Sequence, residues 1–131
     1  MFSHIYYGVS DFERAYAFYS KLMTCLIIKE RFYDRDKPWA GWNSPSSNGR
    51  PLFVIGKPFN GKVHDQGNGQ MIAFNAKDRA TVTAAYNLVI RNGATCEGQP
   101  GLRSEYHESY FGAYFRDLDG NKVCVVCHGV E

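Results

Sequence analysis

The sequence predicts an α+β protein made of two tandem βαβββ modules. The first observation is an internal repeat, since residues 4–25 and 70–96 share one order of features. Each stretch opens with a short β-rich run, continues with an Asp in N-cap position, and then shows the apolar period of an amphipathic helix. The second observation is that strand-like segments follow each helix. The order strand, helix, strand, strand, strand therefore occurs twice.

A polar, glycine-rich stretch separates the two modules. It covers residues 60–69, so that module one spans about 1–59 and module two about 70–131. One module alone offers too little surface to bury both its helix and a face of its sheet. The modules are therefore expected to form a single domain over residues 1–131.

Module one starts with the β-rich run at His4, and Asp11 then caps the predicted helix. The helical period places five apolar residues on one face: Phe12, Ala15, Phe18, Tyr19 and Leu22. Strands are predicted next at residues 25–34, 37–43 and 50–57. A turn at residues 44–49 joins the last two.

Module two starts with the β-rich run at Gln70, and Asp78 caps its helix. The apolar face of this helix consists of Val82, Ala85, Tyr86 and Val89. Asn92-Gly93 is a typical helix stop. Strands are predicted next at residues 94–98, 110–117 and 121–128.

Composition excludes several functional classes. The chain has 21% charged residues and a formal net charge of +2, without a clustered basic stretch, so no nucleic-acid partner is expected. No apolar run approaches the roughly 20 residues that cross a bilayer, and the N-terminus lacks a signal-peptide pattern, so we expect no membrane partner and a cytoplasmic location. Aromatic residues reach 15%, which indicates a lined cavity or an aromatic interface about as readily as an aromatic core.

The stretch CVVCH near the C-terminus matches the Cys-x-x-Cys-His pattern of covalent haem attachment. It is rich in β-branched Val and follows an Asp-Gly turn, which predicts a strand. Alternation along a strand would place Cys124 and His128 on one face and Cys127 on the other. Haem attachment needs both thiols and the imidazole to converge, so no haem is expected.

Two stretches resemble the signatures of a known superfamily. HIYYGVSDFERAYAFY, from His4, is similar to the opening signature of the vicinal oxygen chelate superfamily, which includes glyoxalase I, bleomycin-resistance proteins and extradiol dioxygenases. GAYFRDLDGNKVCVV, from Gly112, is similar to its closing signature, with Leu118 in place of the usual Pro. The resemblance implies a U-shaped, largely antiparallel sheet around a concave pocket. It does not fix the activity, because one fold hosts many functions.

In metal-dependent members of this superfamily, four inward positions of the sheet hold a divalent ion. The resemblance places His4, Gln70 and Cys124 at three of these positions and Val54, which cannot ligate, near the fourth. Only His4 is the usual type of ligand, so we expect no stoichiometric metal. If a divalent metal does bind, these three residues are its expected ligands. One of three loop residues could complete such a site: Glu105, His107 or Glu108.

The resemblance and the strand parity together predict a ligand pocket lined by His4, Tyr6, Gln70, Tyr114 and Cys124. Further candidates for its lining are Trp42 and Tyr110. Trp39 and Trp42 are three residues apart and should face opposite ways, so at most one of them lines the pocket. Tyr110 shares strand parity with Tyr114, and the two could stack on a ligand or pack in the core.

The candidate catalytic residues are His107 and Tyr114. A histidine in a loop that leads to an inward strand could act as a general acid or base, since its ordinary pKa is ~6.5. An exposed surface histidine is the alternative. Arg103 and Arg50 are candidate partners for a ligand carboxylate by residue type alone.

Two functions from different classes stay open. The aromatic content and the incomplete ligand set favour a metal-free protein that binds a small aromatic or oxygenated molecule, as bleomycin-resistance proteins do. The alternative is a glyoxalase-like lyase or isomerase that uses a divalent metal, and an enzyme similar to extradiol dioxygenases comes third. Members of this superfamily with this length commonly form twofold dimers, so a homodimer is expected.

Overall fold

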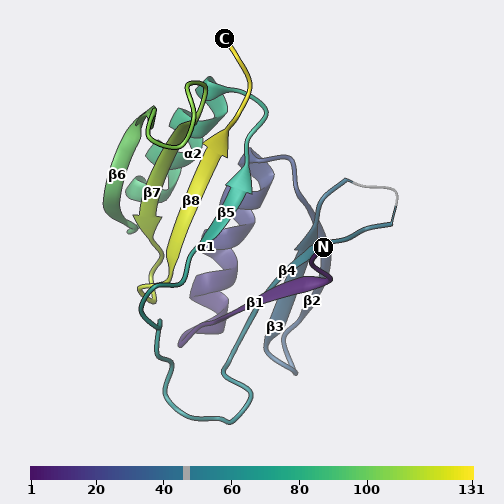
Figure 1. The fold of residues 1–131 in the computed structure, drawn as a ribbon. Coiled ribbons are helices and arrows are strands. Elements are labelled where there is room, and N and C mark those ends of the chain that lie inside the picture. Colours follow the sequence, from purple (N-terminus) through teal and green to yellow (C-terminus); the bar gives the residue numbers. More distant parts are fainter. Residues whose placement is uncertain (46–47) are drawn as a thin grey trace. The chain divides into compact units, whose positions relative to one another are not determined.

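The computed structural model describes residues 1–45 and 48–131, and it confirms the predicted α+β class (Figure 1). Two residues of the turn predicted at 44–49, Ser46 and Ser47, lie outside the described residues. The chain forms two compact units, Met1–Gln66 and Gly67–Glu131, whose boundary falls within the predicted linker. No helix in the described part of the chain is long and apolar enough to cross a membrane.

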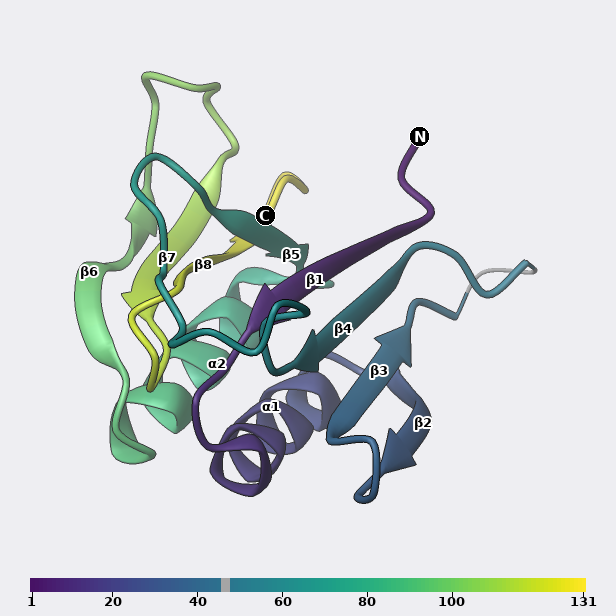
Figure 2. The same ribbon diagram turned by 90° about the horizontal axis from the view of Figure 1, so that it is seen from below.

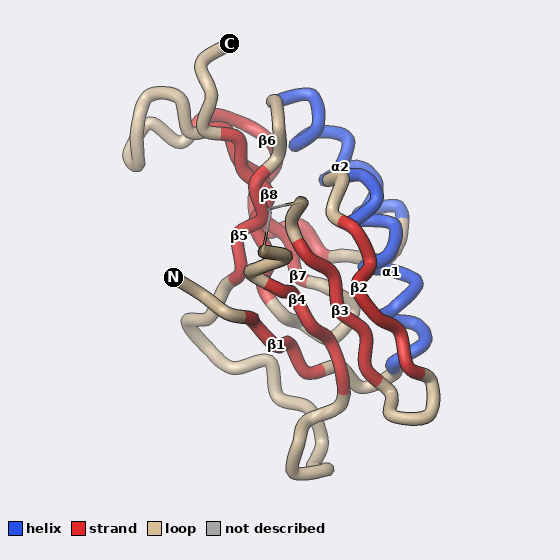
Figure 3. The backbone as a smooth tube through the Cα atoms, turned by 90° about the vertical axis from the view of Figure 1, so that its right-hand side faces the viewer, coloured by secondary structure: helices blue, strands red, loops and turns tan. Residues whose placement is uncertain are grey.

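Unit one contains one helix and a four-stranded sheet. Its elements are β1 (His4–Gly8), α1 (Phe12–Cys25), β2 (Lys29–Asp34), β3 (Trp39–Asn43) and β4 (Leu52–Gly56). The strand order is β1-β4-β3-β2, in which β1 and β4 are parallel and the other pairs are antiparallel. Helix α1 contacts β2, β3 and β4 and runs along one face of this sheet (Figure 3).

Helix α1 forms where its local signals predict it. The Asp11 side chain accepts a hydrogen bond from the Arg14 backbone N–H at 3.2 Å, which caps the first turn. The whole predicted apolar face is buried, and Met23 extends it by one residue. Burial of this face against the sheet, more than helix propensity, stabilises the helix.

The predicted strand at 25–34 starts later than expected. Helix α1 continues to Cys25, and β2 begins only at Lys29. The Ile27 backbone N–H donates to the Thr24 carbonyl at 3.1 Å, which closes the last turn of the helix. Ile27 has a φ of 60°, a backbone conformation that glycine usually adopts at a helix end. Because an apolar residue stands there in place of glycine, the sequence carries no signal for the end of the helix.

Unit two repeats the arrangement. Its elements are β5 (Ile72–Asn75), α2 (Arg79–Arg91), β6 (Thr95–Leu102), β7 (Phe111–Arg116) and β8 (Lys122–Cys127). The strand order is β5-β8-β7-β6, with β5 and β8 parallel and the other pairs antiparallel. Helix α2 contacts β6, β7 and β8 of its own sheet (Figure 2).

Helix α2 also follows its local signals. Both the backbone N–H and the hydroxyl of Thr81 donate to the Asp78 carboxylate, at 2.8 and 2.6 Å. These bonds lower the pKa of Asp78, because they favour its charged form. The helix ends at Arg91 with the predicted Asn92 as its C-cap, and Gly93 follows with a φ of 99°.

Strand β6 is longer than the segment predicted at 94–98. It runs from Thr95 to Leu102 through Pro100, and its pairing with β7 shifts register between Gly98 and Gly101. It is an edge strand, where a bulge tolerates a proline that cannot donate a hydrogen bond. The stretch Gly-Gln-Pro-Gly therefore continues the sheet, although its composition is typical of a loop.

The sheet of unit two has one face that α2 covers and an opposite face, which we call the open face because α2 does not cover it. The Arg79 guanidinium, at the start of α2, lies 5.4 Å from the centre of the Phe111 ring, so Phe111 and the residues that share its strand parity point toward the helix. In the sheet register Phe111 pairs with Cys127, and Tyr114 pairs with Cys124. Tyr114 and Cys124 have the opposite parity and lie on the open face. Cys124 and Cys127 are thus on opposite faces of β8, as predicted.

Candidate functional site

His4 and Tyr6 lie on the side of β1 that points away from α1. Side chains alternate between the two sides of a strand, so His4 and Tyr6 share one side. The other side carries Tyr7, which is buried and contacts Phe53 edge to face. The Tyr6 hydroxyl donates to the Lys57 carbonyl at 2.6 Å, while the residue stays 44% exposed. The common face predicted for His4 and Tyr6 is therefore present.

Trp42 has a different environment from the one expected of a pocket residue. It is only 2% exposed, and its ring stacks on Tyr16 of α1 and on Phe53, with centroids 5.9 and 6.0 Å away. This places Trp42 in the core between the sheet and the helix. Trp39 lies on the opposite face, where it contacts Phe32. We therefore leave Trp42 out of the candidate site.

Gln70 is exposed in the segment that leads to β5. The strand begins at Ile72, two residues later than the expected strand start at Gln70. Ile72 and Phe74 are the buried residues of this short strand, and Gln70 has their parity, whereas Ala73 has the opposite parity and pairs with Cys124. The face shared by Gln70 and Cys124 that the predicted pocket requires is therefore not formed by this strand. The structure thus gives Gln70 no strand pairing that would fix its side chain.

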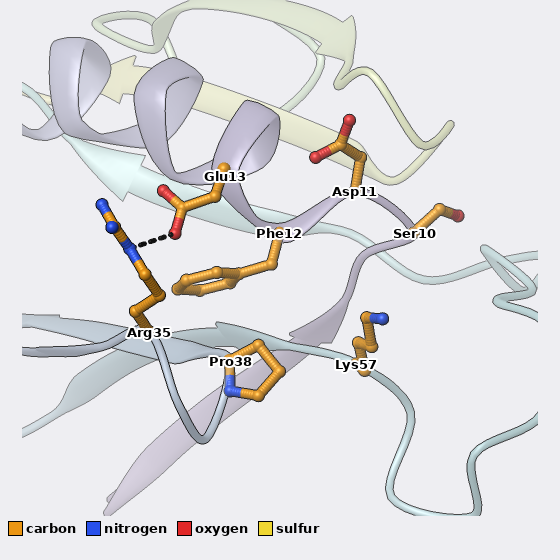
Figure 4. A pocket seen from close by; sticks show the side chains of 7 residues that line it. All are labelled: Ser10, Asp11, Phe12, Glu13, Arg35, Pro38 and Lys57. Carbon is orange, nitrogen blue, oxygen red and sulfur yellow. Dashed lines mark ion pairs between the residues drawn. The ribbon is translucent and has the colours of Figure 1, made fainter.

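A hollow of about 660 Å³ lies beside the start of α1 (Figure 4). Its lining includes Phe12, Lys57 and the ion pair in which Arg35 Nε is 3.5 Å from Glu13 Oε1. Both partners of this pair are more than half exposed, so the pair is weak in water. None of the predicted site residues lines this hollow.

The open face of unit two gathers three of the predicted residues into what we call the phenol–thiol cluster: Tyr110, Tyr114 and Cys124. The two phenol oxygens are 2.8 Å apart, and the Tyr110 oxygen is 3.6 Å from the Cys124 sulfur. Tyr114 stands opposite Cys124 in the β7–β8 register, and Tyr110 reaches them from the end of the hairpin loop. Cys124 is fully buried, whereas both tyrosines are partly exposed.

All three members of the cluster are held in their neutral forms. Burial raises the pKa of Tyr110 far above its ordinary value, and its contacts with Tyr114 and Cys124 add to this rise. Burial likewise raises the pKa of Tyr114 and of the Cys124 thiol, because it disfavours the charged forms. Around neutral pH the cluster therefore consists of two phenols and a thiol.

His107 forms a pair with His128, which the sequence singled out only within the haem pattern. Nε2 of His107 is 2.8 Å from Nδ1 of His128, and the ring centres are 5.1 Å apart. The Ser109 backbone N–H donates to Nδ1 of His107 at 3.2 Å. Nδ1 is therefore an acceptor, and the neutral ring carries its proton on Nε2 and donates it to His128. Both rings make T-shaped contacts with Tyr110.

Two cations flank the ring of Tyr114. The Arg103 guanidinium carbon lies 5.5 Å from the ring centre, and Lys122 Nζ lies 5.7 Å from it. Sequence reasoning proposed Arg103 by residue type only and missed Lys122. Lys122 has the strand parity of Cys124, which was the available signal.

The burial of the thiols predicts how they react with iodoacetamide at pH 8. Cys96 is exposed and should be alkylated first, whereas the buried Cys124 and Cys127 should stay unmodified in the folded protein. The raised pKa of Cys124 lowers its thiolate fraction and shifts its alkylation to higher pH than that of a free thiol. Peptide mass mapping measures this order, and in guanidinium the differences should vanish. Alkylation of Cys124 as fast as Cys96 would contradict the burial.

Two βαβββ units in tandem, each with a helix on one face of its sheet, define the class of protein that the signatures indicated. The profile of the glyoxalase/bleomycin resistance protein/dioxygenase superfamily matches residues 1–125. The chain belongs to this superfamily, which confirms the resemblance of its opening and closing signatures.

The chain is similar to a glyoxalase/bleomycin resistance protein from Albidiferax ferrireducens T118 at 35% sequence identity. This match covers 97% of this chain and 98% of that chain, with a TM-score of 0.86. It is also similar in fold to the fosfomycin resistance protein FosX from Listeria monocytogenes, at 16% identity over 99% of this chain and 94% of that one, with a TM-score of 0.68. Among curated proteins, none matches the chain.

The donors expected for a divalent metal make a poor set. An imidazole, an amide and a thiol, as in His4, Gln70 and Cys124, suit no one common divalent ion. Val54, near the fourth position, is buried and apolar. Within residues 1–45 and 48–131, no three side chains of His, Cys, Asp or Glu gather closely enough to hold an ion, and this includes His107 and its loop neighbours Glu105 and Glu108.

Proposed function

We propose that this protein binds a small, planar, oxygenated ligand on the open face of unit two, without a metal or haem. The phenol–thiol cluster carries this proposal. Tyrosine offers a flat apolar surface together with a hydroxyl, and both suit a ring that bears oxygen. Cys124 and Cys127 lie on opposite faces of β8, so their thiols do not converge on one haem, and this supports a proposal without haem. Homodimer formation and a cytoplasmic location stay predictions.

The hydrogen bonds of the cluster can be exchanged for a bond to a ligand. Tyr110, Tyr114 and Cys124 each contribute one O–H or S–H proton. Contacts between the two phenols and between each phenol and the thiol use these protons. A phenol hydroxyl that gives up one of these contacts can donate to a ligand oxygen instead. An oxygen acceptor is the polar group that suits this cluster.

A binding role accounts for the open face better than catalysis does. A glyoxalase-like lyase or isomerase needs a base with a free lone pair close to the substrate. The two phenols and the thiol keep their protons, since their pKa values are raised. The lone pair of His107 lies on Nδ1 and accepts from the Ser109 N–H, while Nε2 carries the proton, so His107 could serve as a base only after the bond from Ser109 opens. Tyr114 then acts as a donor that orients a ligand.

NMR titration with small planar fragments tests this proposal. Benzoate, benzamide and their hydroxylated analogues are added to ¹⁵N-labelled protein. We expect shifts centred on the amides of β7 and β8 around Tyr114 and Cys124. Tyr114→Phe removes the hydroxyl and keeps the ring, and it should weaken binding about fivefold to tenfold, the range for one lost hydrogen bond. Tyr33→Phe, in unit one, is the matched control and should bind like the wild type.

Two results would contradict the proposal. One is the absence of shifts in β7 and β8 at millimolar concentrations of every fragment. The other is an unchanged affinity in Tyr114→Phe, which would show that the hydroxyl does not meet the ligand.

A further inference from the structure

Arg103 is seated in a gap that two glycines leave in the edge strand β6. A Cβ atom on Gly98 or on Gly101 would lie 3.1 Å from the nitrogens of this guanidinium, closer than side chains normally approach. The backbone of Arg103 is fixed as well, because its N–H donates to the Tyr110 carbonyl at 2.8 Å across the hairpin. The guanidinium therefore has a defined place beside the ring of Tyr114.

Among the residues that the structure describes, most hydrogen-bond donors of this guanidinium have no partner. Arginine has five N–H donors in a planar fork, and one nitrogen of Arg103 donates to the Gln99 carbonyl at 2.7 Å. In the part of the chain that the structure describes, the ion pairs join Arg35 to Glu13, Arg79 to Glu131 and Arg116 to Glu97, so none involves Arg103. The Arg103 guanidinium can therefore donate two hydrogen bonds to one carboxylate in bidentate geometry.

The surroundings of Arg103 add to the positive field. Lys122 lies on the same face and also approaches the ring of Tyr114. Burial raises the pKa of the Cys124 thiol, whereas the positive charges of Arg103 and Lys122 lower it. Both charges therefore act on the phenol–thiol cluster. An anionic group bound here would be attracted by two cations and would lie next to neutral phenols.

We infer that the ligand is a planar aromatic carboxylate whose ring contacts Tyr114 and whose carboxylate pairs with Arg103. This inference rests on the proposed function, and it adds the charge and the chemical class of the ligand. A free oxygen on the same ring would accept a hydrogen bond from a phenol hydroxyl of the cluster. Hydroxybenzoates and related aromatic acids have this combination of groups.

Matched pairs of probes separate charge from shape. Benzoate and benzamide have nearly the same outline, and only benzoate is an anion. We expect the wild-type protein to bind benzoate about tenfold more tightly than benzamide, the factor that one charge-assisted pair provides. Raising the salt concentration should weaken benzoate alone. The affinities come from the β7 and β8 amide shifts.

Three variants complete the test. Arg103→Gln should lose the tenfold preference for benzoate and leave benzamide binding unchanged, whereas Arg103→Lys should keep part of the preference. Arg14→Gln makes the same chemical change at an exposed position of unit one and should behave like the wild type. Equal affinities for benzoate and benzamide, or an unchanged preference in Arg103→Gln, would overturn the carboxylate inference and leave the proposed binding site standing. No shifts with either probe would overturn both.

Discussion

Replacing Trp42 with Ala is expected to lower the free energy of unfolding by about 3–5 kcal/mol, the cost of truncating a buried aromatic residue. The Trp42 side chain is 2% exposed and lies between Tyr16 of the helix and Phe53 of the neighbouring strand. Its removal leaves a cavity in a layer where the helix and the backbone of the sheet cannot fully collapse. Urea unfolding followed by far-UV circular dichroism measures the change.

Trp39→Ala is the matched control, because it removes the same side chain from the other face of the same strand. Trp39 is partly exposed and contacts Phe32 and the ammonium group of Lys37. Its loss should cost about 1–2 kcal/mol, the value for burying part of a large apolar side chain. A larger loss in Trp39→Ala than in Trp42→Ala would refute the assignment of the two faces.

Asp117→Ala is expected to destabilise unit two by about 3 kcal/mol, because it leaves buried hydrogen-bond donors without the carboxylate that accepts their bonds. The Asp117 carboxylate accepts hydrogen bonds from the backbone N–H of Asp119 at 2.8 Å and of Asn121 at 2.9 Å. It also accepts one from the Asn121 side-chain amide at 3.0 Å. Asp117 and Asn121 are only 5% and 2% exposed, so water cannot easily replace the carboxylate. Thermal unfolding of the variant measures the loss.

Asp117→Asn keeps the shape of the side chain and one acceptor oxygen, and it should therefore recover about half of the loss. A second control, Asp36→Ala, removes an exposed carboxylate from unit one and should leave stability unchanged. Should Asp117→Ala unfold at the wild-type temperature, the turn between β7 and β8 would not depend on this carboxylate.

The sequence by itself determined the repeat, both helix starts and the last two strands. The signals for these elements are local, because an N-cap such as Asp11 or Asp78 acts within three residues and an apolar helix face repeats within four. Strand β8 was predictable for the same reason, since its run of Val and the Asp-Gly turn before it lie next to each other. Strand alternation then gave the opposite faces of Cys124 and Cys127 without a structure.

Only the tertiary structure decided which of two alternating faces meets a helix. Alternation shows that Trp39 and Trp42 differ, but the choice depends on Tyr16 and Phe53, which are far away in the sequence. The helix end at Ile27 was hidden because its left-handed backbone carries an apolar residue in place of glycine.

The candidate site follows the same division. Sequence named Tyr110, Tyr114, Cys124 and His107 through parity and resemblance. Their hydrogen bonds, the partnership of His107 with His128 and the seat of Arg103 beside Tyr114 appear only when β6, β7, β8 and the hairpin loop come together. Such contacts join residues 4 to 21 positions apart, and no local pattern of the chain sets their distances. They arise because pairing in the sheet brings separate stretches of chain into register.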